Sequence, residues 1–192
     1  MFEAISGLSA AFGLSGSAGL NAYIPLLLVA LAARFPMSDP LVKLQAPFDL
    51  LGSWWAIGLI AVLLVVEIVA DKIPAVDTVN DTIQTFIRPA AGAILFAGSA
   101  NVITDVHPIL ALGSGLLVAG GVHATKTAAR PVVTVTTGGI GNPIVSTLED
   151  IVAFVVSLLA IILPIIAAIL LIIFLFLVIY FVRRRRQRRM MF

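Results

Sequence analysis

Cysteine is missing from this sequence of 192 residues, and histidine occurs only twice. A chain without cysteine forms no disulfide, carries no thiol nucleophile and offers no thiolate to a metal. Two histidines are too few for an ordinary zinc centre, so we expect no metal and no cofactor. The usual motifs of hydrolases, nucleotide-binding loops and metalloproteases are also missing, which predicts a protein that is not an enzyme.

Charge is scarce as well. Charged residues make up 11% of the chain and hydrophobic residues 60%, with a mean hydropathy of +1.13. Soluble domains contain roughly 25% charged residues. The composition therefore predicts an integral membrane protein, whose main partner is the lipid bilayer.

The basic residues that are present lie mostly at one end. Half of the twelve lysines and arginines fall within residues 183–189, so residues 1–182 carry an excess of acidic side chains. The positive net charge thus describes a tail and predicts no nucleic-acid partner. A basic cluster after a long apolar run predicts a cytoplasmic C-terminus, in a multi-pass protein of the bacterial inner membrane.

The first apolar run, residues 5–33, is too long for a single membrane helix. As one helix it would measure about 44 Å, against a hydrocarbon core of roughly 30 Å. Gly19, Asn21 and Pro25 predict a break, because glycine relaxes the backbone, asparagine bonds freed backbone groups and proline lacks a donor. Two short passes and a re-entrant pair both remain open.

Further helices follow from the remaining apolar runs. We expect a spanning helix over residues 53–70, a helix from about Asp77 to Ala100 kinked at Pro89, and an apolar block over residues 109–122. Residues 36–52 suit a segment in the membrane interface, and residues 124–143 are polar enough to predict a loop or re-entrant segment. A final run covers residues 151–182, with a kink at Pro164.

These elements define the predicted fold class. It is an all-α integral membrane protein with five or six membrane segments, a broken N-terminal helix and one transmembrane domain over residues 1–182. Residues 183–192 form a basic cytoplasmic tail. Residues 13–22 align with residues 115–124, and residues 74–81 with residues 143–150. The two matches occur in the same order and predict an internal repeat, with halves of about 5–100 and 105–182.

Polar residues on two consecutive helices indicate a candidate site. Glu67 and Asp71 are four residues apart and share one helix face, and Asp77, Asp81 and Arg88 share a stripe of the next helix together with a glutamine. The short turn between the helices should bring these faces together. Four carboxylates against Arg88 and a turn lysine would bind a cation. As alternatives, Asp77 caps its helix and Asp81 forms a structural ion pair with Arg88.

Asn21 and His123 occupy matched positions in the two halves, each next to a glycine-rich helix. Many transporters bind substrate at broken helices between repeats. Lys126 and Arg130 would attract anions there. The alternatives are that Asn21 only satisfies the broken backbone, that His123 caps a helix end, and that the two basic residues snorkel to the interface. The candidate ion-binding or substrate-binding residues are Asn21, Glu67, Asp71, Asp77, Asp81, Arg88, His123 and Lys126.

Four short motifs resemble those of a known family. They are Gly-Leu-Asn-Ala-Tyr-Ile-Pro at residues 19–25, Glu-x-x-x-Asp-Lys-Ile-Pro-x-x-Asp at 67–77, Arg-Pro-Ala-Ala-Gly at 88–92 and His-Ala-Thr-Lys at 123–126. Together they are similar to uncharacterised bacterial integral membrane proteins that share a domain of unknown function. The resemblance covers about residues 5–165. It implies a membrane location and attaches no substrate.

The sequence therefore leads to two hypotheses. The first is a small membrane transporter or channel for an ion or small solute, working as a homodimer because one copy has few helices to wall a path. The alternative is a non-transporting membrane scaffold or accessory protein. A polar stripe that faces the protein interior favours transport, and one at the headgroup level favours the scaffold.

Overall fold

The computed structural model describes residues 2–35, 44, 46–100 and 106–166, and positions 169, 172, 173, 176 and 180. Within these residues every regular element is a helix, which confirms the all-α prediction. The elements are α1 (Phe2–Leu20), α2 (Tyr23–Arg34), the short 3-10 helix η1 (Phe48–Gly52), α3 (Trp54–Ala70), α4 (Pro74–Ala100), α5 (Pro108–Thr137) and α6 (Asn142–Ile162).

The first apolar run is broken at the predicted place, between Leu20 and Tyr23. Asn21 Oδ1 accepts hydrogen bonds from the backbone N–H groups of Tyr23 at 3.0 Å and Ile24 at 3.1 Å. Pro25 lies in the first turn of α2, where a missing N–H removes no intrahelical bond. The predicted break and the backbone role of Asn21 are both confirmed.

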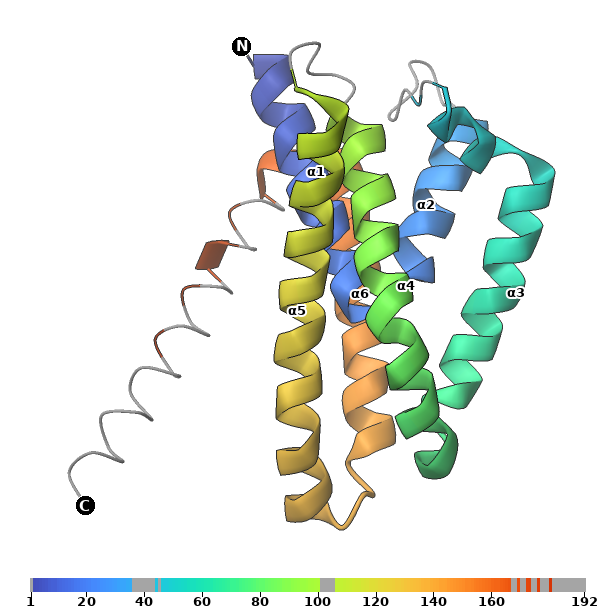
Figure 1. Cartoon of the computed structure of the whole chain (residues 1–192), viewed down its shortest axis with the longest axis vertical. Coiled ribbons are helices and arrows are strands. Elements are labelled where there is room, and N and C mark those ends of the chain that lie inside the picture. Colours follow the sequence, from blue (N-terminus) through green and yellow to red (C-terminus); the bar gives the residue numbers. More distant parts are fainter. Residues whose placement is uncertain are drawn as a thin grey trace.

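Helices α1 and α2 form a hairpin that extends only part of the way along the molecule. Their 19 and 12 residues span about 28 and 18 Å, whereas the 30 residues of α5 span about 45 Å. In Figure 1 the start of α1 and the end of α2 both lie at the upper end, and the tip lies near the middle of the long axis. The chain thus returns through α2 to the end of the bundle from which α1 starts (Figure 1).

The other long helices alternate in direction along the long axis. Figure 1 shows α3 and α5 running downward and α4 and α6 running upward. Residues 71–73 make a tight turn between α3 and α4, which are antiparallel, but α3 diverges from α4 and packs against α2. Helix α1 is central, since it contacts α4, α5 and α6.

Small residues let these helices approach closely, as the four-residue spacing of glycine and alanine predicts. A side chain at Gly92 would overlap Ala119, and a side chain at Gly19 would lie 2.5 Å from the Ala119 carbonyl oxygen. Ser15 Oγ donates to the carbonyl of Gly92 at 2.9 Å, and Ser17 Oγ donates to that of Ala153 at 2.7 Å. Buried serines thus tie α1 to α4 and α6.

The prediction of a loop or re-entrant segment over residues 124–143 is wrong. Helix α5 continues to Thr137 and ends at Gly138, whose φ of 62° suits glycine. Threonine hydroxyls within this stretch donate to the carbonyl four residues earlier, as Thr127 does to His123 and Thr134 to Arg130. Such bonds let threonine persist inside a helix, and the basic side chains gain buried partners described below.

Two helix boundaries also differ from the prediction. Helix α4 begins at Pro74, before Asp77, and α6 begins at Asn142, well before residue 151. Ser146 therefore lies inside α6 and is buried. Helix α6 ends at Ile162, next to the expected kink at Pro164. Most of the predicted interfacial segment before Ala46 and the tail of residues 183–192 lie outside the described residues.

Two of the described helices, α5 and α6, are long and apolar enough to cross a membrane, judged by length and composition. Helices α1, α2 and α3 are apolar but shorter by the same measure. Large apolar side chains are also exposed on the outside of the bundle, among them Trp55 at 85% and Val135 at 84%.

Candidate functional site

Arg88 lies at the centre of a buried group of charges where α3 meets α4. Its side chain is fully buried, and Nη2 donates to Glu67 Oε1 at 2.9 Å. Asp71 Oδ2 lies 3.9 Å from Nη2, and Asp81 Oδ1 lies 3.8 Å from Nη1. The predicted meeting of the two polar faces is thus confirmed for these four residues. The side chain of Asp77 lies outside the described residues.

Helix α5 adds two basic side chains to the same group. Lys126 Nζ lies 2.9 Å from Glu149 Oε2 and 3.8 Å from Asp71 Oδ2. Arg130 lies 3.4 Å from Glu149, 3.5 Å from Asp81 and 3.7 Å from Asp71. Both basic side chains are buried, at 2% and 9% exposure, so the alternative of snorkelling residues is wrong. We call the following residues the charged cluster: Glu67, Asp71, Asp81, Arg88, Lys126, Arg130 and Glu149.

The tip of the α1–α2 hairpin reaches this cluster. Lys126 Nζ donates to the carbonyl oxygen of Leu20, the last residue of α1, at 3.2 Å. Asn21 Nδ2 donates to Asp150 Oδ1 at 2.9 Å, and Asp150 Oδ2 lies 4.0 Å from the half-exposed Lys72. The break in the N-terminal helix is therefore held by polar groups from α5 and α6 as well as by its own cap.

Asp71 is the most heavily bonded carboxylate of the cluster. Asn80 Nδ2 donates to its Oδ1 at 2.7 Å, and Ser146 Oγ donates to its Oδ2 at 3.3 Å. Three basic side chains also lie within 4 Å of the same carboxylate. Asp71 therefore has both neutral and charged donors around its carboxylate.

His123 links the charged cluster to α4 from the middle of α5, so its interpretation as a helix-end cap is wrong. Nδ1 lies 3.0 Å from Arg88 Nη1, and a guanidinium can only donate. Nδ1 must then be the bare acceptor, and Nε2 carries the hydrogen and donates it to Thr85 Oγ1 at 3.1 Å. The Thr85 hydroxyl in turn donates a hydrogen bond to the backbone carbonyl oxygen of Asp81 at 2.8 Å. The geometry requires a neutral imidazole.

The charge balance of the cluster differs from the sequence prediction. Four carboxylates face three basic groups, and Asp150 with Lys72 forms a further balanced pair. The charged cluster, counted over the described residues, therefore carries an excess of one negative charge. This excess is smaller than the one expected from α3 and α4 alone. The difference arises because Lys126 and Arg130 point inward.

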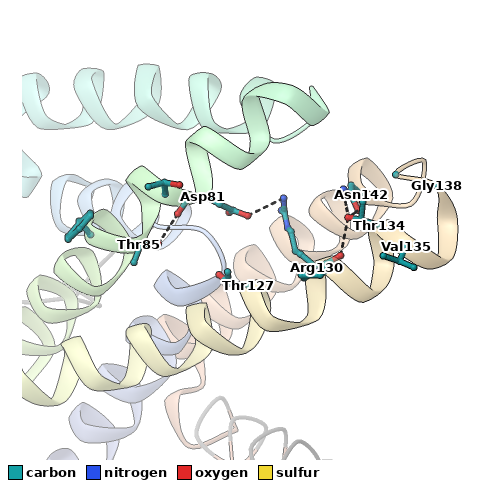
Figure 2. A pocket seen from close by; sticks show the side chains of 12 residues that line it. Asp81, Thr85, Thr127, Arg130, Thr134, Val135, Gly138 and Asn142 are labelled. Atoms are coloured by element: carbon teal, nitrogen blue, oxygen red, sulfur yellow. Dashed lines mark hydrogen bonds and ion pairs between the residues drawn. The ribbon is translucent and has the colours of Figure 1, made fainter.

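A groove of about 840 Å³ opens beside the cluster. Figure 2 shows that Arg130 reaches from α5 toward Asp81 on α4, with Thr85 and Thr127 beside them and Asn142 near the turn into α6. The lining residues are Asp81, Thr82, Thr85, Phe86, Thr127, Arg130, Pro131, Thr134, Val135, Gly138, Gly139 and Asn142. Since Arg130 and Asp81 belong both to this wall and to the cluster, their ion pair separates the groove from the interior charges.

The part of the chain that the structure describes contains no candidate metal centre. No group of three or more histidine, aspartate or glutamate side chains there could hold a metal ion. The carboxylates instead face arginine and lysine.

The candidate residues derived from the sequence leave out three members of this site, Arg130, Glu149 and Asp150, although Arg130 is one of the basic side chains expected to attract anions. A signal for Arg130 exists, because His123, Lys126 and Arg130 are spaced by three and four residues and share one helix face. It becomes visible only when residues 124–137 are taken as helix. The acidic residues of α6 carry no comparable signal, since they follow a short polar stretch like an ordinary helix start.

The fold and the site define a class of protein: a helical bundle with a half-length hairpin and a buried charged cluster. The chain belongs to the family described as a domain of unknown function (DUF4126), which matches residues 8–184. The resemblance to a domain of unknown function is thereby confirmed. No curated protein and no solved structure matches the chain.

Proposed function

We propose that this protein is a small transporter or channel of the bacterial inner membrane that moves an ion or small polar solute through the charged cluster. It would cross the membrane several times, place its C-terminus in the cytoplasm and work as a homodimer. The single observation that carries the proposal is a buried set of charges at the tip of a helix hairpin that ends inside the bundle.

The outer surface supports a lipid environment. Exposed large apolar side chains cover successive turns of α3, such as Leu59, Val62 and Val66. Contiguous apolar surface of this kind is unfavourable in water and favourable against lipid tails. In that setting α5 and α6 would cross the bilayer and the charged cluster would lie away from the lipid.

Ionisable groups at such depth are costly, and in membrane proteins they mark ion paths and relays. The hairpin resembles the discontinuous helices of transporters in one physical respect. The end of α1 and the start of α2 place backbone dipoles and Asn21 next to the charges. The groove supplies access from one end of the bundle, with the Arg130–Asp81 pair as the barrier between them.

One observation favours the scaffold as a second candidate. Most charges of the cluster pair with each other, as Lys126 does with Glu149 and Arg88 with Glu67. Internal pairing of this kind also stabilises a bundle that transports nothing, because partners lower the desolvation cost of each buried ion.

A flux assay separates the two candidates. The purified protein in liposomes should conduct or exchange at least one member of a panel of protons, alkali cations, halides and small polar solutes. Asp81→Asn should lower that flux roughly tenfold or more, because it removes the negative charge that pairs with Arg88 and Arg130, and a tenfold change in rate corresponds to about 1.4 kcal/mol. Asp49→Asn is the matched control, since Asp49 is an exposed residue of η1 and does not belong to the charged cluster. No flux from folded wild-type protein would favour the scaffold, and equal flux from both variants would contradict a path through the charged cluster.

A further inference from the structure

The charged cluster holds one carboxylate more than its basic groups can balance. An uncompensated ion buried in a low-dielectric interior costs several kcal/mol, so proteins neutralise such a group instead. With one of the four carboxyl groups protonated, three carboxylates would face Arg88, Lys126 and Arg130, and the described cluster would be neutral. The question is which carboxyl group carries the proton.

Asp71, Asp81 and Glu149 are poor candidates. Asp71 lies within 4 Å of three basic side chains and accepts two further hydrogen bonds. Glu149 has Lys126 at 2.9 Å and Arg130 at 3.4 Å. Asp81 lies near two arginines and is 15% exposed. Each of the three therefore has at least two basic partners that favour its ionised form.

Glu67 has the least compensation. It is 1% exposed and has one basic partner within 4 Å, Arg88, which it shares with Asp71 and Asp81. Among the described residues its Oε2 accepts no hydrogen bond. The same is true of Oε1 of Gln84, a 2% exposed residue one turn before Arg88. Both acceptors are buried near the hydroxyl of Tyr23, the first residue of α2.

One proton would remove the excess charge. A protonated Glu67 keeps one oxygen as the acceptor for Arg88 and turns the other into a hydroxyl donor. The charged and titratable groups near Glu67 are Asp71 on its own helix, Arg88 on α4, Tyr23 on α2 and Lys126 on α5. The side chain of Gln84 interacts with that of Tyr23.

We propose that Glu67 binds a proton in the resting protein, in a site completed by Gln84 and by Tyr23 at the tip of the hairpin. The inference rests in part on the proposed transport function, because it names the proton as the ion that such transport would use. The proton-binding site itself does not require transport.

Infrared spectroscopy of the folded protein tests the site directly. At neutral pH the wild type should show the carbonyl stretch of a protonated carboxylic acid, with a shift in heavy water, and Glu67→Gln should lack it. Asp49→Asn makes the same chemical change at an exposed carboxylate outside the charged cluster, leaves the charge balance of the cluster unchanged, and should keep the band. If Glu67→Gln does not fold, Glu67→Asp serves instead, because it retains an acid whose band moves in frequency. A wild-type spectrum without the band, or a band unchanged in the Glu67 variants, overturns the proposal.

Thermal unfolding gives a second readout. Glutamine mimics a neutral acid, so Glu67→Gln should unfold at nearly the wild-type temperature. Glu149→Gln should unfold several degrees lower, because it leaves Lys126 without its shortest partner. A larger loss for Glu67→Gln than for Glu149→Gln would show that Glu67 is ionised and would refute the inference.

Measuring proton flux in liposomes distinguishes a failure of this inference from a failure of the proposed function. An acid band without any flux would retain the proton site and refute transport. Flux of another ion without the band would retain transport and refute the proton site.

Discussion

Asn21 combines two structural roles in one side chain. Its Oδ1 caps the first turn of α2, and its Nδ2 donates to Asp150 on α6. An amide can do both because it carries an acceptor oxygen and a separate donor nitrogen at the end of its side chain, whereas serine has a single, shorter hydroxyl, an ionised aspartate has no donor and alanine has neither. At the residue scale the broken helix therefore depends on asparagine specifically.

Replacement of Asn21 by alanine should destabilise the protein by about 2–4 kcal/mol. Loss of the cap contributes about 1 kcal/mol, and loss of the hydrogen bond to a carboxylate about 1.5–3 kcal/mol. Denaturant unfolding in detergent, followed by circular dichroism, measures the difference. Asn21→Ser keeps a capping oxygen and lacks the reach to Asp150, so it should recover only the smaller part. Equal losses in both variants would show that the cap adds no stability.

At the scale of elements, close approach of α1, α4 and α5 builds the interior. The glycines at the contacts leave backbone against backbone, and a methyl group at Gly92 would overlap Ala119 and lie 2.8 Å from the Gly115 carbonyl oxygen. The buried charges lie just below this tightly packed layer, so the spacing of α4 and α5 also sets the distance from Arg88 to His123.

Gly92→Ala should therefore lower the free energy of unfolding by about 1–3 kcal/mol, the usual cost of overpacking. Gly58 on α3 is a matched control, because a methyl group there meets nothing within 4 Å. Gly58→Ala should be neutral or stabilise by up to about 1 kcal/mol through helix propensity. Thermal unfolding of both variants in detergent measures the contrast. A Gly92→Ala protein as stable as Gly58→Ala would contradict the packing described here.

The predicted repeat also belongs to this scale. The matched segments lie on α1 and α5, which both run downward in Figure 1, and on α4 and α6, which both run upward. Matching directions are what two parallel copies require. The repeat stays a prediction, since the hairpin turns back after Asn21 whereas α5 continues past His123.

For the whole molecule, the outer apolar surface and the interior charges are separated as a membrane protein requires. The charge asymmetry along the chain then predicts an orientation, because basic residues beside an apolar membrane segment are retained on the cytoplasmic side.

A C-terminal fusion should therefore report a cytoplasmic end. A fluorescent protein fused after Phe192 should fluoresce, and alkaline phosphatase at the same position should be inactive. Replacement of the arginines of residues 183–189 by glutamine is the control and should weaken the bias. An active phosphatase on the unchanged chain would contradict the predicted orientation.

Several features were determined by the sequence alone because their causes are local. The helical class follows from the long apolar runs, and the break at Asn21 follows from a run that exceeds any bilayer and contains both asparagine and proline. The meeting of Glu67 and Asp71 with Arg88 follows from helix periodicity and a short turn. Each of these inferences uses residues of one apolar run, or of two helices joined by a short turn.

Only the tertiary structure decided the extent of α5 and the composition of the charged cluster. Residues 124–137 contain Lys126, Arg130, Pro131 and five threonines, a composition typical of a polar connection. They form a helix whose two basic side chains are buried, because acidic partners come from α3, α4 and α6, up to 59 residues away in the case of Asp71 and Arg130. The cost of burying a basic side chain depends on those distant partners, and no local pattern contains them. The excess charge that points to a proton on Glu67 emerges only once all of these helices are packed together.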